Sequence, residues 1–354
     1  MKKIVALLMS TAVLFVLGGC ANDTSGAETN SEIFVATSFF PMYDFTRNIV
    51  GEAGTVSMIV PPGAEAHHFE PTPSNLAEIE RAGAFVYLSA EMEFWVPSVL
   101  DSVDTNNLTI IQASEDIEFI EWNQEGMDFS LSESEHSHGH EESDDEHGHS
   151  HSHGESEDIH GESSVHDHVD SDNDVHEHGH SHSHDYDPHI WLSPALAIRQ
   201  VERIRDGLIE AYPQARETFT ANAAAYIAKL QVLDTEFRTA FEHATHRTFV
   251  VQHAGFAYLA REYSLNQVAI SGLSEPTAAR LAELRTFVLD NHIEVVYFEQ
   301  NANESAARTL AEEVGVRLEV LNSLESLSSE EMAQGEDFIS VMRQNLEALK
   351  QTIH

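Results

Sequence analysis

Runs that favour strands alternate with runs that favour helices in two blocks of this 354-residue chain. Apolar, β-branched runs predict strands in the first block at 33–37, 55–60, 84–88 and 108–112, with helices at 41–50, 75–82 and 92–99. The second block predicts strands at 248–252, 267–271, 294–298 and 317–321, with helices at 255–263, 277–291, 304–314 and 329–350. Such alternation is typical of parallel βαβ units whose sheets are covered on both faces. We therefore expect an α/β protein of two lobes, each with a parallel four-stranded sheet and surrounding helices.

A long amphipathic segment, 214–243, separates the two blocks. Its apolar residues recur at alternating steps of four and three, which is the spacing of one buried helical stripe: Phe219, Ala223, Tyr226, Leu230, Leu233, Phe237 and Ala240. A helix of about 30 residues is about 45 Å long. We expect one long rigid helix to join the lobes.

A low-complexity tract precedes that helix. Residues 131–187 contain 18 Asp or Glu and 15 His, and no Lys or Arg. The tract has few apolar side chains, and their burial could not offset the entropy lost when the chain is ordered. It is therefore predicted to be a disordered insertion. Its alternating His-x-His spacing lets several neutral imidazoles reach one ion, which predicts auxiliary, weak metal binding by His136, His138, His140, His147, His149, His151, His153, His178, His180, His182 and His184. The alternative is a charged spacer that is merely rich in histidine.

The formal net charge of the chain is −42. Nucleic acid is excluded as a partner, because phosphate binding needs a basic surface. The acidic surface would attract cations, although an adaptation to a saline habitat explains the same composition.

The N-terminus carries the pattern of a secretory signal. Lys2 and Lys3 precede an apolar run, 4–17, which ends at Gly18, Gly19 and Cys20. The run is too short to span a bilayer comfortably. The sequence LGGC resembles the bacterial lipobox, which implies a lipid on Cys20 and an extracytoplasmic protein anchored to the cell membrane; the alternative is an uncleaved anchor with an incidental cysteine. Cys20 is the single cysteine of the chain, so a disulfide within one chain is impossible.

Four short motifs lie at the ends of predicted strands or in loops beside them. They are GAEAHHFEPTP at 63–73, DYDPHIWLSP at 185–194, FVVQHAGFAYLA at 249–260 and VVYFEQNAN at 295–303. Ligands bind at the carboxyl ends of strands in open α/β sheets. Each motif offers a metal-binding side chain, so together they predict one site with three imidazoles and one carboxylate. Such a set suits tetrahedral Zn²⁺, whereas Mn²⁺ prefers more carboxylate oxygen.

Taken in order, these motifs resemble the metal-binding solute-binding proteins of ABC importers, in the zinc branch of the ZnuA/AdcA type. The resemblance covers nearly all of the chain after the signal. It implies Zn²⁺ as the transported ligand and maps the metal ligands onto His67, His189, His253 and Glu299. The manganese branch carries a carboxylate in place of the third histidine, so His253 favours zinc. Ala66 stands where the family usually has proline, and the adjacent His68 leaves open which of the two histidines is the first ligand.

The resemblance also implies a monomer that delivers zinc to an ABC importer membrane permease. The alternatives are a manganese or iron carrier of the same family, and a surface adhesin or metal buffer that is not coupled to transport. An enzyme is not expected, because a fourth protein ligand closes the coordination shell and HExxH is absent from the sequence. Asp187 is a candidate partner for the N–H of a metal-bound imidazole.

These features predict seven segments. They are a signal peptide (1–19), a lipid-linked tether (20–31), the N-terminal lobe (32–127), the acidic His-rich loop (128–187), the end of the N-terminal lobe (188–213), the linking helix (214–245) and the C-terminal lobe (246–354).

Overall fold

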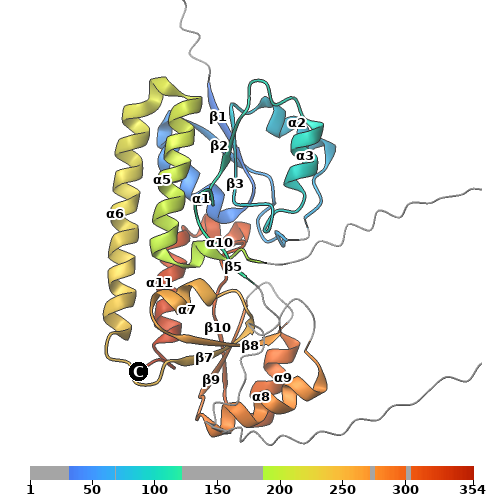
Figure 1. Cartoon of the computed structure of the whole chain (residues 1–354), viewed down its shortest axis with the longest axis vertical. Coiled ribbons are helices and arrows are strands. Elements are labelled where there is room, and N and C mark those ends of the chain that lie inside the picture. Colours follow the sequence, from blue (N-terminus) through green and yellow to red (C-terminus); the bar gives the residue numbers. More distant parts are fainter. Residues whose placement is uncertain (1–31, 68, 122–185, 272–275, 300–303) are drawn as a thin grey trace, which may run out of the picture. The chain divides into compact units, whose positions relative to one another are not determined.

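The computed structural model describes residues 32–67, 69–121, 186–271, 276–299 and 304–354 (Figure 1). Residues Ile33–His354 belong to one compact unit. The predicted signal peptide, Cys20, the tether, His68 and the eleven auxiliary histidines lie outside the described residues. The division of the chain into seven segments therefore stays a prediction.

The N-terminal sheet confirms the predicted parallel arrangement. Its strands are ordered β2-β1-β3-β4, and every neighbouring pair is parallel. The strands are β1 (Ile33–Thr37), β2 (Gly54–Met58), β3 (Ala84–Tyr87) and β4 (Thr109–Gln112), and the helices between them are α1 (Phe40–Val50), α2 (Pro73–Arg81) and α3 (Val96–Ser102), with a 3₁₀ turn, η1, at Gly51–Ala53. Thr72 caps α2 through a capping box with Asn75, and Pro73 occupies the first turn, where a missing N–H costs nothing.

The C-terminal sheet repeats this arrangement in the order β10-β9-β7-β8, again with parallel neighbours. Its strands are β7 (Thr248–His253), β8 (Asn266–Ser271), β9 (Val295–Phe298) and β10 (Arg317–Val320). Its helices are α7 (Ala257–Glu262), α8 (Ala278–Asp290), α9 (Ser305–Val314), α10 (Ser329–Ala333) and α11 (Phe338–Leu349). The predicted pair of four-stranded parallel sheets is therefore confirmed.

Two helices connect the sheets, α5 (Pro194–Ala211) and α6 (Arg216–Phe241), with the 3₁₀ turn η3 (Pro213–Ala215) between them. Figure 1 shows α5 and α6 side by side, and α6 also packs against α1 and α11. The stripe predicted for this segment faces the core: Phe219, Ala223, Tyr226, Leu230, Leu233 and Phe237 are buried, and Ala240 is partly buried against the same core. Since α6 packs against helices of both lobes, it ties the lobes together along its length.

The main hydrophobic core is continuous from the N-terminal sheet through α5 and α6 to α11. A second, smaller cluster lies in the C-terminal lobe, between its sheet and helices α8 and α9. The rings of Phe45 on α1 and Phe338 on α11 meet edge to face at 4.9 Å. Apolar side chains of both lobes therefore pack into one contiguous core.

Helix α5 (Pro194–Ala211) was not predicted from the sequence. Three further features differ from the prediction. Helix α3 begins at Val96 rather than Met92, because the carboxylate of Glu93 accepts hydrogen bonds from the backbone N–H groups of Leu88 and Ser89 and holds that stretch as a turn. The helix predicted at 329–350 is two helices, broken at Gly335 (φ 90°), before Asp337 caps α11.

A short antiparallel pair is the third difference. Strand β5 (Ile120–Glu121) pairs with β6 (Tyr186–Asp187), and the opposite residues are Ile120 with Asp187 and Glu121 with Tyr186. Two-residue strands carry no periodicity that a sequence pattern can reveal. This pair brings together residues 121 and 186, which are far apart in the sequence. Among the described helices, none combines the length and apolar character needed to cross a membrane.

Candidate metal centre

Three of the four predicted ligands come from segments at the carboxyl ends of the two parallel sheets. His67 lies in the loop after β2, His253 is the last residue of β7, and Glu299 directly follows β9. His189 lies between β6 and the 3₁₀ turn η2 (Ile190–Leu192). Carboxyl ends of parallel strands share one edge of a sheet, so the topology carries these side chains to the binding edge of each lobe.

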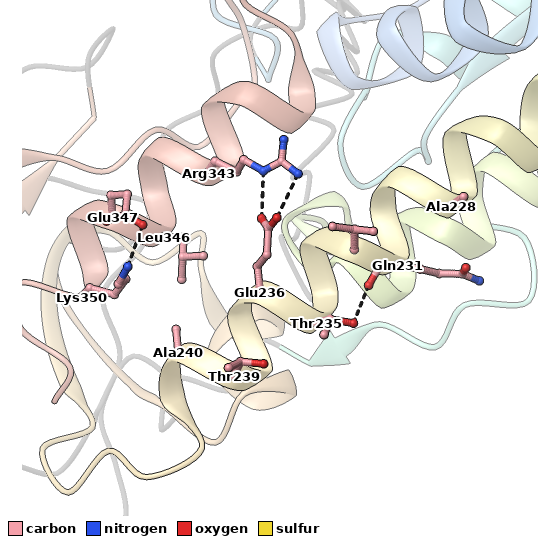
Figure 2. A pocket seen from close by; sticks show the side chains of 11 residues that line it. Ala228, Gln231, Thr235, Glu236, Thr239, Ala240, Arg343, Leu346, Glu347 and Lys350 are labelled. Atoms are coloured by element: carbon pink, nitrogen blue, oxygen red, sulfur yellow. Dashed lines mark hydrogen bonds and ion pairs between the residues drawn. The ribbon is translucent and has the colours of Figure 1, made fainter.

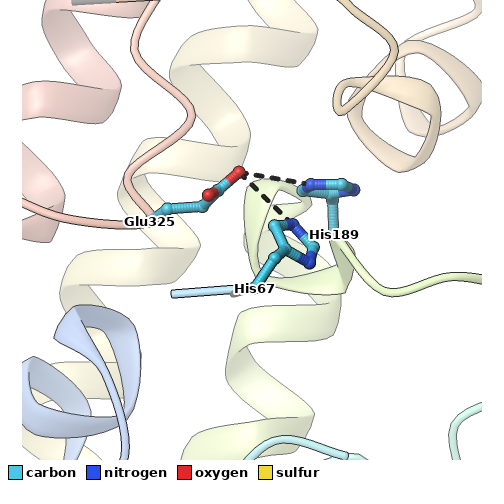
Figure 3. A group of neighbouring side chains, drawn as sticks. All are labelled: His67, His189 and Glu325. Carbon is cyan, nitrogen blue, oxygen red and sulfur yellow. Dashed lines mark ion pairs between the residues drawn. The ribbon is translucent and has the colours of Figure 1, made fainter. Parts of the chain in front are cut away.

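Three side chains converge on one point, as Figure 3 shows. One donor atom each from His67, His189 and Glu325 lies within 4.8 Å of the other two. The Oε1 atom of Glu325 is 3.7 Å from Nε2 of His67 and 3.4 Å from Nε2 of His189. Glu325 follows β10 in the C-terminal lobe, so this cluster joins the two lobes.

His253 adds a third imidazole to the cluster. Its Nε2 atom is 3.3 Å from Nε2 of His189, and the two ring centroids are 5.0 Å apart. Gly255 makes room for both rings, because a Cβ at this position would lie 3.1 Å from Cδ2 of His253 and 3.2 Å from Cδ2 of His189. His67, His189 and Glu325 thus form the closest group of donor atoms, and His253 lies beside it through His189. Imidazole nitrogens and a carboxylate oxygen are donors that suit Zn²⁺.

Burial and nearby charges shift the pKa values of His189 and His253 in opposite directions. Burial alone would lower the pKa of His189, but Asp187 and then Glu325 outweigh it and raise that pKa to about 10. Burial lowers the pKa of His253 to about 3, and the positive charge of His189 adds to the effect. Without metal, His189 is therefore the protonated imidazole of this pair and His253 the neutral one.

The carboxylate in the cluster is Glu325, which the sequence prediction missed. Burial opposes its ionisation, but the nearby imidazoles of His189 and His67 hold the pKa of Glu325 well below its usual range. Like His67, Glu325 lies in a loop after a parallel strand, five residues beyond Val320 at the end of β10. Its position after a predicted strand could have identified Glu325 as a candidate ligand, although Glu325 lies in none of the four motifs.

Glu299, the predicted fourth ligand, is a second carboxyl group in the same neighbourhood. It is 8% exposed, and its Oε1 atom has no hydrogen-bond partner among the described residues. Burial and the negative charge of Glu325 raise the pKa of Glu299 to about 7. The group of donor atoms within 4.8 Å of one another consists of His67, His189 and Glu325, and contains neither Glu299 nor His253.

A separate groove on the surface is lined by side chains other than those of the cluster. It has a volume of about 1030 Å³ and lies between α6 and α11, where Figure 2 shows the ion pair of Glu236 with Arg343 beside Leu346 and Ala240. Its lining contains none of the four clustered side chains. It offers no set of metal donors, so the cluster at the strand ends is the candidate site.

The fold and the clustered donors define a two-lobed metal-binding protein. A family model described as the zinc-uptake complex component A, periplasmic (ZnuA), matches residues 35–352. The chain belongs to this family.

Curated relatives and solved structures agree with this assignment. The chain is 41% identical over 355 residues to the zinc-binding lipoprotein AdcA of Streptococcus pneumoniae, covering 99% of this chain and 61% of that protein. It therefore spans less than two thirds of the AdcA length. It is 38% identical over 358 residues to the high-affinity zinc uptake system protein ZnuA of Bacillus subtilis, covering 99% of this chain and 98% of that protein.

Among solved structures, the Zn(II)-bound ZnuA-like domain of S. pneumoniae AdcA matches with a TM-score of 0.68 and 38% identity over 91% of this chain and 98% of that one. The metal-dependent lipoprotein YcdH of B. subtilis matches with a TM-score of 0.69 and 36% identity, covering 91% of this chain and 99% of that one. These matches confirm the resemblance predicted from the motifs.

Proposed function

We propose that this chain is the extracytoplasmic zinc-binding component of an ABC importer. It captures Zn²⁺ with His67, His189, His253 and Glu325 and delivers the ion to a membrane permease. Support comes from the family assignment and from relatives whose names describe zinc binding and zinc uptake. The observation that carries the proposal is the convergence of His67, His189 and Glu325 from both lobes, with a third imidazole, His253, 3.3 Å from His189.

This donor set suits capture rather than catalysis. Catalytic zinc keeps a position open for water beside three protein ligands, whereas four protein donors fill a tetrahedral shell. The ionised Glu325 offsets half of the positive charge of a bound Zn²⁺. The proposal therefore does not include an enzymatic activity.

The chain's place in the cell is part of the same proposal. A lipid on Cys20 anchors the protein to the outer face of the cell membrane, and the protein acts as a monomer. The sequence LGGC and the relatives named as lipoproteins support the anchor. The permease accepts the ion when the two lobes present the loaded site to it.

Metal titration of the mature chain tests the function. Elemental analysis should find one tightly held zinc per chain, and calorimetry should show weaker binding of Mn²⁺ than of Zn²⁺. His253 is a proposed ligand, so His253→Ala should weaken Zn²⁺ binding by at least about a hundredfold. His243 is an exposed residue after α6, so His243→Ala should leave the affinity unchanged. Tighter binding of Mn²⁺, or equal affinity of the two variants, would refute a zinc site at this cluster.

Uptake in cells tests delivery. A strain whose own copy carries His253→Ala should grow normally in zinc-replete medium and poorly when a chelator limits zinc. Added zinc should restore growth, whereas added manganese should not. Normal growth of this strain under zinc limitation would contradict a role in zinc import.

A further inference from the structure

We propose that four hydrogen bonds between the lobes, two made by Tyr258 and one each by Trp191 and Ser326, form a clasp that slows the release of the bound metal. This inference rests on the proposed zinc-binding function and adds the positioning residues that govern the lifetime of the complex. Each bond joins a segment next to a metal-binding residue of one lobe to a segment of the other lobe.

Tyr258 makes the most extensive of these contacts. It lies on α7 of the C-terminal lobe and is 1% exposed. Its hydroxyl oxygen accepts the backbone N–H of Ile120 at 2.8 Å, and its O–H donates to the backbone carbonyl of Asp187 at 2.7 Å. Ile120 and Asp187 are directly opposite one another in the β5–β6 pair. A single hydroxyl group therefore fastens both strands of that pair to the C-terminal lobe.

The hydrogen bonds of Tyr258 are linked along the chain to two of the proposed metal-binding imidazoles, His189 and His253. Asp187 uses its carbonyl to hold Tyr258 and its carboxylate to hold His189. Tyr258, in the first turn of α7, follows His253 at the end of β7 by five residues. The hydroxyl thus helps to fix the segment that carries His189 against the segment that carries His253, whose Nε2 atoms are 3.3 Å apart.

Two further bonds flank the other donors. The Nε1–H of Trp191, two residues after His189, donates to the backbone carbonyl of Ser323, two residues before Glu325. That bond is 2.8 Å long, and Trp191 is fully buried. The backbone N–H of Gly63, in the loop that carries His67, donates to Oγ of Ser326 at 2.7 Å.

The four bonds surround the site and must break if the ligand segments separate. A bound ion leaves when its donors move apart, so bonds that hold the donor segments together oppose dissociation. One neutral hydrogen bond stabilises by about 0.5–1.5 kcal/mol, which corresponds to about a two- to twelvefold change in a rate that requires its rupture. Affinity differences of this kind appear mainly in the dissociation rate.

The clasp is tested by the kinetics of zinc release from the full mature chain. Zn²⁺ dissociation is followed by stopped-flow mixing with an excess of a chromogenic chelator, for the wild type, Tyr258→Phe and Ser326→Ala. Tyr212→Phe is the matched control, because its buried hydroxyl donates to the carbonyl of Phe34 in β1 at 2.7 Å, outside the clasp. Thermal unfolding without metal measures the cost of each substitution to the fold.

We expect Tyr258→Phe and Ser326→Ala each to raise the dissociation rate by about two- to tenfold, with a much smaller change in the association rate. Tyr212→Phe should lower the unfolding temperature to a similar degree and leave the dissociation rate unchanged. The tetrahedral absorption spectrum of bound Co²⁺ should be the same in all variants, because the metal ligands are untouched.

Equal dissociation rates in Tyr258→Phe, Ser326→Ala and Tyr212→Phe would overturn the clasp. If Tyr258→Phe does not fold, Ser326→Ala decides alone, and an unchanged rate overturns the inference. Failure of the wild type to bind Zn²⁺ is a different result, because it removes the proposed function itself.

Discussion

The Oδ1 atom of Asp187 lies 2.7 Å from Nδ1 of His189 and also accepts the backbone N–H of His189 at 3.0 Å. One oxygen therefore fixes both the ring and the main chain of this residue. Because Asp187 faces Nδ1, it favours the tautomer that carries a proton there and leaves Nε2 directed at Glu325 and His253. The sequence prediction of Asp187 as a partner for an imidazole N–H agrees with this geometry.

Removal of that carboxylate should weaken zinc binding although Asp187 is not itself a proposed ligand. Asp187→Ala frees the ring of His189 to turn and lowers its basicity, so we expect a loss of about 10- to 100-fold in Zn²⁺ affinity by calorimetry. Asp206→Ala is the control, since Asp206 is exposed and pairs with its neighbour Arg205 on α5. Equal affinities of the two variants would show that Asp187 does not orient the ligand.

The two buried carboxyl groups should differ in their importance. Glu325 lies among the donor atoms, whereas Glu299 lies outside the closest group. Glu325→Gln replaces an ionised donor with a neutral one, so Zn²⁺ affinity should fall by at least about a hundredfold, while Glu299→Gln should change it by less than about tenfold. Calorimetric titration of both variants decides the point. A larger loss in Glu299→Gln would restore the ligand assignment made from the sequence motifs.

The strands and the linking helix could be predicted because their patterns are local. Buried parallel strands are continuous β-branched runs, and α6 shows one clear stripe from Phe219 to Phe237. The break at Gly335 was missed because apolar residues continue on both sides of it. The β5–β6 pair was missed because it depends on a contact between residues 120 and 187, which no local pattern encodes.

The assignment of His67, His189 and His253 as ligands stays a prediction, and each of them lies in a motif that the sequence makes recognisable. Glu325 lies in the sequence LNSLES, which resembles an ordinary loop. Its role depends on distance, since Oε1 comes within 3.4 Å of Nε2 of His189 only when the two lobes are in place. Charge coupling of the two carboxyl groups likewise depends on packing, because Glu325 raises the pKa of Glu299 through space.

Zinc binding at neutral pH should release protons. Asp187 and Glu325 raise the pKa of His189 to about 10, so this imidazole holds a proton that the metal must displace. His253 is already neutral, because burial lowers its pKa to about 3. We expect about one proton from His189 to leave per Zn²⁺ bound at pH 7.5, measured by calorimetry in buffers of different ionisation enthalpy. Heats that do not depend on the buffer would contradict a protonated His189.

The same protons make affinity depend on pH. The raised pKa of His189 means that its proton is bound below pH 6.5 in the folded and unfolded chain alike, and is lost from the folded chain only as the pH approaches about 10. Zinc affinity should therefore rise by about tenfold per pH unit between pH 6.5 and 9. A competing chelator of known pH dependence measures this slope, and equal affinity at pH 5.5 and 7.5 would refute an imidazole-rich site.

Deletion of residues 132–183 tests the auxiliary role predicted for the histidine-rich sequence. The eleven auxiliary histidines fall between His136 and His184, whereas the clustered donors lie outside that range. The composition of this sequence predicts disorder, so an ion bound there must order the chain around it, at about 1–2 kcal/mol per residue fixed. The cluster, in contrast, is already formed by packed segments. The full chain should thus show one tight site and several weaker ones.

The deletion should remove the weak class and leave the tight site nearly unchanged. The pairing of Ile120 with Asp187 and the hydroxyl of Tyr258 hold the flanks of the deleted stretch, so the geometry at His189 should persist. Tethered weak sites raise the local metal concentration, so the deletion should slow growth under zinc limitation and not in rich medium. Calorimetry on the shortened chain measures both classes. Loss of the tight site would mean that the histidine-rich sequence supplies ligands to it, and the four-residue cluster would then not be the complete site.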